Sequence, residues 1–233
     1  MVLEKGVREM ILSTGVFLPE IKPVIDNMIT LETGEILGRT YSRGVIGQNE
    51  IVATSGFVGK VETAVITQKF IDVFKPNQII FTSGVGALDD SLEPGKMILG
   101  TEFQQYDVFL PMRSGMVSVD TDETPAIQHL REHATKIEFC KIISGDKIVM
   151  SKKERDSLRK RFNARCLDMD SAVLARVASM NNVGFTVLKV VLDYCDENSE
   201  KDFSMNFEKY GYYPAELITE LLKKHILDFK RKK

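Results

Sequence analysis

The chain has 233 residues, with 31 Lys and Arg against 33 Asp and Glu, no tryptophan and an aromatic content of 8%. A charge balance this close to neutral gives no field that attracts a polyanion or an acidic membrane surface, and few aromatic side chains leave little for stacking on nucleic acid bases. No stretch approaches the ~20 apolar residues of a membrane span. We therefore exclude nucleic acid and membranes as partners and expect a single domain over residues 1–233.

Six short runs rich in β-branched residues predict strands, and several of them end in Gly, Ser, Thr or Asp. In chain order these runs are residues 9–16, 50–56, 78–86, 96–103, 137–146 and 185–196. Helical patterns occupy residues 19–28, 59–74, 154–162, 170–182 and 214–233. Residues 37–50 resemble a turn-linked hairpin. This alternation predicts an α/β fold, with a central sheet, crossover helices and an antiparallel addition.

The cysteines Cys140, Cys166 and Cys195 are scattered, without Cys-x-x-Cys spacing or a nearby pair of histidines. The pattern favours reduced thiols in a cytosolic protein over disulfides or a zinc site. The first 15 residues mix charges among the apolar residues and lack the apolar core of a secretory signal. We expect a cytoplasmic protein with no metal site.

In sheets of this kind, ligands usually lie beyond the carboxyl ends of the strands. The polar residues at the predicted strand ends therefore matter most: Glu20, residues 82–90 (TSGVGALDD), residues 144–149 (SGDKIV), residues 167–171 (LDMDS) and Asp193. The glycine-rich stretch is not a Walker sequence, because no Lys-Ser/Thr pair follows, and it lacks the Rossmann spacing. We expect no cofactor.

Taken in order, these segments resemble the 5'-methylthioadenosine/S-adenosylhomocysteine nucleosidases of the nucleoside phosphorylase superfamily. The resemblance runs through residues 11–24, 57–64, 76–99, 106–108, 142–149 and 167–197. It implies a three-layer α/β fold, in which helices flank a mixed, twisted central sheet, and a homodimer. It also implies hydrolysis of the bond between adenine N9 and the ribose of a small adenine thionucleoside, a reaction of methionine salvage.

That reaction builds positive charge on the sugar and negative charge on the departing purine, so it needs an acid near the base and carboxylates near the sugar. The resemblance assigns Asp193 as the acid that protonates adenine N7 and Glu20 as the base that activates water. It places Asp170, which is a glutamate in the family, on the ribose hydroxyls, with Met169 beside the sugar. Simpler roles exist for each acid: an exposed first-turn residue for Glu20, a turn residue for Asp193 and a helix cap for Asp170.

The chain departs from the family pattern at several other positions. Lys189 stands where the arginine partner of the glutamate is usual, and a lysine cannot reproduce the planar fork of an arginine. Leu192 replaces the serine expected to orient the acid, and Gly84 replaces a small hydroxyl residue. In the purine pocket Ile148 replaces an aromatic residue, whereas backbone hydrogen bonds from Val149 can survive.

The remaining substrate contacts are assigned by the same resemblance. Val85 and Gly86, in the glycine-rich stretch, are expected at the substrate. Met205 is expected in the pocket for the 5'-alkylthio group, together with Phe203 and Phe207, although such a cluster is more often plain core. Residues 102–116 are expected to bring Tyr106 and Asp107 close to the dimer interface.

Two other functions stay open. A phosphate-dependent purine nucleoside phosphorylase would need arginines around the glycine loops, but Phe81 stands where hexameric phosphorylases carry one. A nucleoside-binding homologue with weakened or lost turnover is suggested by the accumulated departures at Asp170, Lys189, Leu192 and Ile148.

Overall fold

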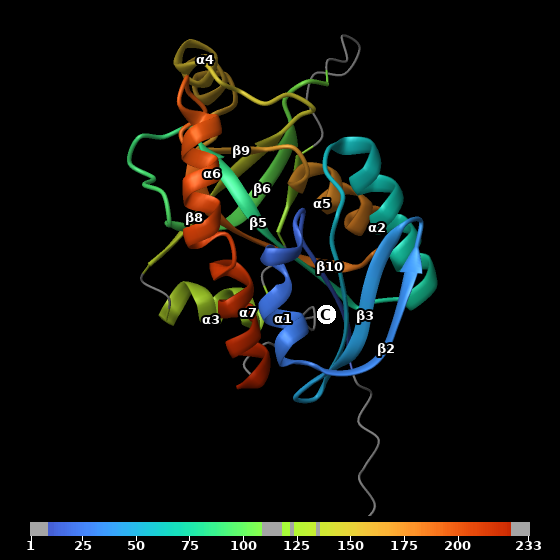
Figure 1. Cartoon of the computed structure of the whole chain (residues 1–233). Helices are drawn as coiled ribbons and strands as arrows, with labels where there is room; N and C mark the ends of the chain where they lie inside the picture. The colour runs from blue at the N-terminus through green and yellow to red at the C-terminus, as the bar shows by residue number, and fades with distance from the viewer. Residues whose placement is uncertain (1–8, 109–117, 122–123, 134–135, 225–233) are drawn as a thin grey trace, which may run out of the picture.

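The computed structural model describes residues 9–108, 118–121, 124–133 and 136–224 (Figure 1). The strands in this part are β1 (Met10–Thr14), β2 (Ile29–Ile36), β3 (Arg39–Ile46), β4 (Asn49–Thr54), β5 (Gln78–Ala87), β6 (Met97–Gln105), β7 (Ser118–Asp120), β8 (Ile137–Ser144), β9 (Cys166–Asp168) and β10 (Gly184–Asp193). The helices are the 3-10 turn η1 (Leu18–Glu20), α1 (Lys22–Asn27), α2 (Lys60–Phe74), α3 (Pro125–His133), α4 (Lys152–Phe162), α5 (Ser171–Met180), α6 (Ser199–Tyr210) and α7 (Tyr213–Lys223).

The strands form one mixed sheet whose centre is β5. β1 and β10 lie on either side of β5 and run parallel to it. From β10 the pairing continues through β6, β8 and β9 and returns to β5, so that these five strands form a closed ring. From β1 the sheet extends as an open arm through β4, β3 and β2. Because β1, β5 and β10 are parallel, their carboxyl ends meet at one edge of the sheet.

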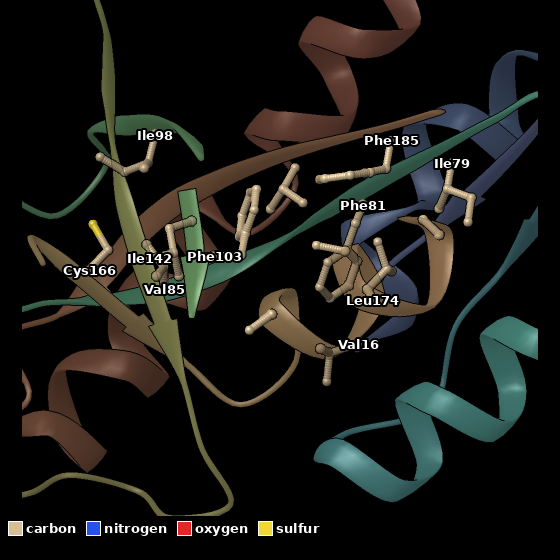
Figure 2. Close-up of a cluster of buried hydrophobic side chains, with 14 of the residues drawn as sticks. Val16, Ile79, Phe81, Val85, Ile98, Phe103, Ile142, Cys166, Leu174 and Phe185 are labelled. Carbon is tan, nitrogen blue, oxygen red and sulfur yellow. The ribbon is translucent and has the colours of Figure 1, made fainter. Parts of the chain in front are cut away.

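Helices cover both faces of this sheet (Figure 1). Alternating residues of β5 separate the faces: Ile79 and Phe81 enter one hydrophobic cluster, and Ile80 enters another. The first cluster lies against α2 and α5, and the second against α1, α3 and α7. Figure 2 shows the first cluster, in which the rings of Phe103 and Phe185 meet edge to face at 5.7 Å. The result is the predicted three-layer arrangement.

The six predicted strands are confirmed as β1, β4, β5, β6, β8 and β10. The hairpin predicted at residues 37–50 is also confirmed, because β3 pairs antiparallel with β4. The predicted helix over residues 19–28 is divided into η1 and α1, and residues 225–233 of the last predicted helix lie outside the described residues. The sequence interpretation missed β2, β7, β9, α3 and α6. No helix in the described part of the chain is long and apolar enough to cross a membrane.

Candidate active site

Glu20 lies at the end of η1, where the chain turns back after β1, and its side chain is buried. Oε2 accepts hydrogen bonds from the backbone amides of Val16 and Phe17, both at 2.8 Å, and Oε1 accepts one from the amide of Gly84, also at 2.8 Å. Burial raises the pKa of Glu20 to about 7, although these amides and the charge of Lys189 oppose the shift. The exposed first-turn role is therefore wrong: Glu20 is a buried carboxyl poised to exchange a proton near neutral pH.

Asp193 is the last residue of β10. Both Asp193 and Glu20 contact the end of β5. Asp193 pairs with Gly86, and Gly84 donates to Glu20, so the two contact points are separated by two residues of one strand, about 6–7 Å. Gly86 is required here, since a Cβ at this position would lie 2.3 Å from Cys195 Sγ and 3.2 Å from Asp193 Oδ1. Burial raises the pKa of Asp193 and favours its protonated form.

Lys189 is fully buried in the middle of β10. Its Nζ forms an ion pair with Asp168 Oδ2 at 3.0 Å, donates to the hydroxyl of Ser83, and lies 3.7 Å from the centre of the Phe81 ring. Burial opposes ionisation of Asp168, but Lys189 and the hydroxyls of Ser144 and Ser171 outweigh it and lower the pKa of Asp168. The lysine at the position expected for an arginine therefore neutralises the first acid of the LDMDS segment.

The two acids of that segment have different roles. Asp168 accepts hydrogen bonds from the amides of Asp170 and Ser171, and so it caps the start of α5. Asp170 occupies the N-cap position but makes no side-chain capping bond there. Its Oδ1 instead accepts from the amide of Gly59 at 2.6 Å and from Thr63 Oγ1 at 3.0 Å, at the start of α2. The expectation that the Asp170 side chain caps the following helix is therefore wrong: the Ala172 amide, which such a cap would bind, donates to Ser144 Oγ at 2.9 Å, and Asp170 Oδ1 binds the start of α2 instead.

The environment of Asp170 also differs from that of an ordinary surface acid. Burial, and next the charge of Asp168, raise the pKa of Asp170 to about 6, against the opposing effects of Lys189, Gly59 and Thr63. Among the described residues, Asp170 accepts both of these hydrogen bonds at Oδ1 and none at its second oxygen, Oδ2. Met169, between the two acids, is half-buried.

The loop that follows β8 is fixed to the start of α2. Asp146 Oδ1 accepts from the amide of Lys60 at 2.7 Å, and Lys60 Nζ pairs with Asp107 Oδ2 at 2.7 Å. This network places Ile148 with 66% of its surface exposed and Val149 in a small core cluster with its side chain buried. Because Gly59 and Lys60 are adjacent, the amides that hold Asp170 and Asp146 are successive residues of one helix start. The loop after β8 and Asp170 thus share one support, the start of α2.

Aromatic side chains gather beside Glu20. Phe17 meets the rings of Phe203 and Phe207 at 6.4 Å and 5.3 Å, and those two rings stack on each other at 5.6 Å. Met205 lies two residues from each of them on α6, so its side chain leaves the helix on nearly the opposite side, and it is 54% exposed. The structure therefore groups the two phenylalanines with Phe17 and sets Met205 apart. Val85, by contrast, is buried in the main core cluster.

The structure brings together most of the residues that the sequence singled out. Three contacts could not be anticipated from any motif: Ser83 with Lys189, Gly59 with Asp170, and Ser199 with Asp193. The first two contacts join segments that are distant in the sequence, and their register cannot be read from it. The third lies at the start of α6, a helix that the sequence analysis did not predict. Residues 109–117, part of the segment expected near a dimer interface, lie outside the described residues.

A sequence model of the phosphorylase superfamily matches residues 10–223 of this chain, from β1 to the end of α7. The 5'-methylthioadenosine/S-adenosylhomocysteine nucleosidase of Thermotoga maritima is 35% identical over 215 residues, which cover 92% of this chain and 99% of that protein. The chain belongs to the 5'-methylthioadenosine/S-adenosylhomocysteine nucleosidase family within this superfamily.

Solved structures agree on the fold. The Helicobacter pylori nucleosidase bound to butyl-thio-DADMe-Immucillin-A superposes with a TM-score of 0.86 at 23% identity, covering 94% of this chain and 100% of that one. The futalosine hydrolase of Helicobacter pylori gives a TM-score of 0.85, also at 23% identity, covering 93% and 98%. The predicted fold and family are both confirmed.

Proposed function

We propose that the protein hydrolyses the N-glycosidic bond of 5'-methylthioadenosine and S-adenosylhomocysteine, releasing adenine and a thioribose product. The observation that carries this proposal is a set of three carboxyls at one edge of the sheet, the buried Glu20 and Asp170 and the half-buried Asp193, each with a raised pKa. Acids with pKa values shifted toward neutrality suit proton transfer. The relatives described above are named as nucleosidases, which is the reaction class proposed here.

In the proposed reaction, the bond between ribose C1' and adenine N9 breaks and its electron pair moves into the purine. Asp193 donates a proton to N7, which neutralises the charge developing on the leaving group. Water attacks C1', and Glu20 accepts the proton that this water loses. Asp170 has Oδ1 engaged by Gly59 and Thr63, so Oδ2 is the oxygen available to the ribose hydroxyls.

Water is a better nucleophile for this site than phosphate. Phe81 is buried in the core cluster and contacts Lys189, so no cationic side chain stands at that position. Lys189 contacts the glycine-rich stretch through Ser83, beside the Gly84 amide that binds Glu20, and Asp168 neutralises it. The stretch also contacts Arg155, Arg159 and Arg165, but these cations are paired with its own acids, Asp89 and Asp90. A phosphate dianion needs unpaired cationic donors, which favours hydrolysis over phosphorolysis.

The substrate pocket is proposed to have two further parts. Val149 would offer backbone hydrogen bonds to adenine, with the exposed side chain of Ile148 against the ring in place of an aromatic partner. The cluster of Phe17, Phe203 and Phe207 would pack against the 5'-alkylthio group, since it lies beside Glu20 and combines exposed and half-buried rings.

We also propose a cytoplasmic homodimer that acts in methionine salvage. Val61 and Val65 are four residues apart on α2, which places them on one side of the helix, and they are 74% and 52% exposed; Val58, just before the helix, is exposed as well. A row of exposed valines on a stable helix is typical of a surface buried by a partner. A monomer at micromolar concentration by sedimentation would contradict this assembly.

The function is tested by measuring adenine release from 5'-methylthioadenosine in buffer with and without phosphate. We expect release that does not depend on phosphate. Release that requires phosphate would identify a phosphorylase, and tight binding of the nucleoside with no release would identify a binding protein.

A further inference from the structure

The side chain of the proposed acid, Asp193, is held by residues that follow it in the chain. The amide of Cys195 donates to Asp193 Oδ1 at 2.8 Å. Burial raises the pKa of this carboxyl, whereas the Cys195 amide, the Ser199 hydroxyl and the Cys195 thiol, which lie close to it, lower it. The turn between β10 and α6 therefore places one bonded amide and two further groups able to donate beside the acid.

The turn is built to present these donors. Cys195 adopts a left-handed backbone conformation with φ of +53°, which is uncommon for a residue other than glycine, asparagine or aspartate and reverses the chain directly after the acid. Ser199, the first residue of α6, accepts a hydrogen bond from the amide of Asp196 at 2.8 Å. Because this bond occupies an acceptor lone pair, the hydroxyl proton of Ser199 is free to point at Asp193.

The thiol of Cys195 is equally constrained. It is buried and fits against Gly86, where an added Cβ would lie 2.3 Å from Sγ. Burial, followed by the nearby Asp193, raises the pKa of this thiol well above its ordinary value, so it keeps its proton and acts as a donor. Leu192, by contrast, is fully buried, and its Cδ1 lies 2.2 Å from where a Cβ on Gly84 would stand. Leu192 fills space beside the glycine stretch and has no group with which to orient the acid.

We propose that Cys195 and Ser199 are positioning residues that fix the Asp193 carboxyl at the substrate base. They take the orienting role that Leu192, which has no polar group, cannot perform. This inference rests on the proposed function for its effect on turnover. Its structural part concerns only the carboxyl and the groups that donate to it. If the turn after β10 holds the Asp193 carboxyl, a hydroxyl at position 192 is not required to orient it.

The test measures Asp193 itself as well as activity. The titration of its carboxyl is followed by carbon NMR, with Asp193→Asn identifying the signal, in the wild type, Ser199→Ala, Cys195→Ala and the conservative variant Cys195→Ser. Ser204→Ala is the matched control, because Ser204 lies on the same helix, is exposed and donates to the Glu200 carbonyl. Steady-state kinetics on 5'-methylthioadenosine are measured for the same proteins.

Removing a donor from a carboxylate makes ionisation harder, so Ser199→Ala is expected to raise the pKa of Asp193 by ~0.5–1 unit. It should also lower kcat by roughly 10-fold with a smaller change in KM, because the acid loses its orientation. Cys195→Ser should stay closer to the wild type than Cys195→Ala does, and Ser204→Ala should change nothing. An unchanged titration and kcat in both Ser199→Ala and Cys195→Ala would overturn the proposal. A shifted titration combined with full turnover by Asp193→Asn would instead overturn the proposed function and leave the positioning contacts standing.

Discussion

Lys189 Nζ lies 3.0 Å from Asp168 Oδ2, and both side chains are buried. This ion pair joins the two halves of the site. Lys189 also donates to Ser83, next to the Gly84 amide that binds Glu20, whereas Asp168 accepts from the amide of Asp170. The acid proposed for water and the acid proposed for ribose are therefore connected through one buried lysine.

Replacing Lys189 by methionine should leave Asp168 as an uncompensated buried charge. Loss of one partner of a buried pair costs about 3–5 kcal/mol of unfolding free energy, which urea denaturation measures. The control is Lys147→Met, which removes an exposed pair with Glu154 and should cost at most ~1 kcal/mol. Equal effects of the two substitutions would show that the Lys189 pair contributes no more than a surface contact.

Glu20 should make the protein less stable as pH rises. Its pKa is raised from 4.5 to about 7 on folding, so the folded state binds the proton more tightly and stability is lost as pH increases between those two values. Between about pH 5 and pH 8 the wild type should lose ~2–3 kcal/mol more than Glu20→Gln, as measured by urea unfolding at each pH. Parallel pH profiles for the two proteins would mean that Glu20 is not a buried titrating carboxyl.

Asp170 should contribute to ribose recognition as well as to structure, and the two roles can be separated. Thr63→Val removes one hydrogen bond to Asp170 Oδ1 but leaves the carboxylate, whereas Asp170→Ala removes both. We expect the wild type and Thr63→Val to discriminate against a 2'-deoxy analogue more strongly than against a change in the 5' tail, and Asp170→Ala to lose this discrimination. Equal handling of the deoxy and parent nucleosides by the wild type would leave Asp170 with only its structural contacts to α2.

Asp170 is also one methylene shorter than the glutamate usual in the family. Its carboxylate must therefore approach the sugar through a backbone shift or through a bridging water. We expect slower turnover than in a relative that carries glutamate, since a displacement of the sugar by about 1 Å can cost ~10²-fold in rate. The measurement is kcat on 5'-methylthioadenosine beside that of a nucleosidase carrying glutamate at this position, and equal turnover by the two proteins would contradict the expectation.

The sheet strands could be predicted because β1, β5 and β10 are nearly continuous apolar runs buried on both faces. β2 was missed because its residues are mostly exposed and show no hydrophobic pattern; within the described sheet it is an edge strand that pairs with β3. α6 was missed because its polar residues interrupt the few apolar ones. The ordered motifs identified the acids but not their partners. The registers of β9 and β10 on their common neighbour β5 decide that Lys189 reaches Asp168, and the position of the start of α2 decides that Asp170 is not a cap.

The most direct test of the account is the behaviour of Asp193→Asn. An amide can still hydrogen-bond to adenine but has no proton to give, so binding of 5'-methylthioadenosine, measured by calorimetry, should change by only a few fold, whereas adenine release should fall by ~10²–10⁴-fold. Asp72→Asn, at an exposed acid of α2 that accepts from Gln68, serves as the matched control and should keep full activity. Near-normal adenine release by Asp193→Asn would contradict the central claim that this carboxyl is the acid for the departing base.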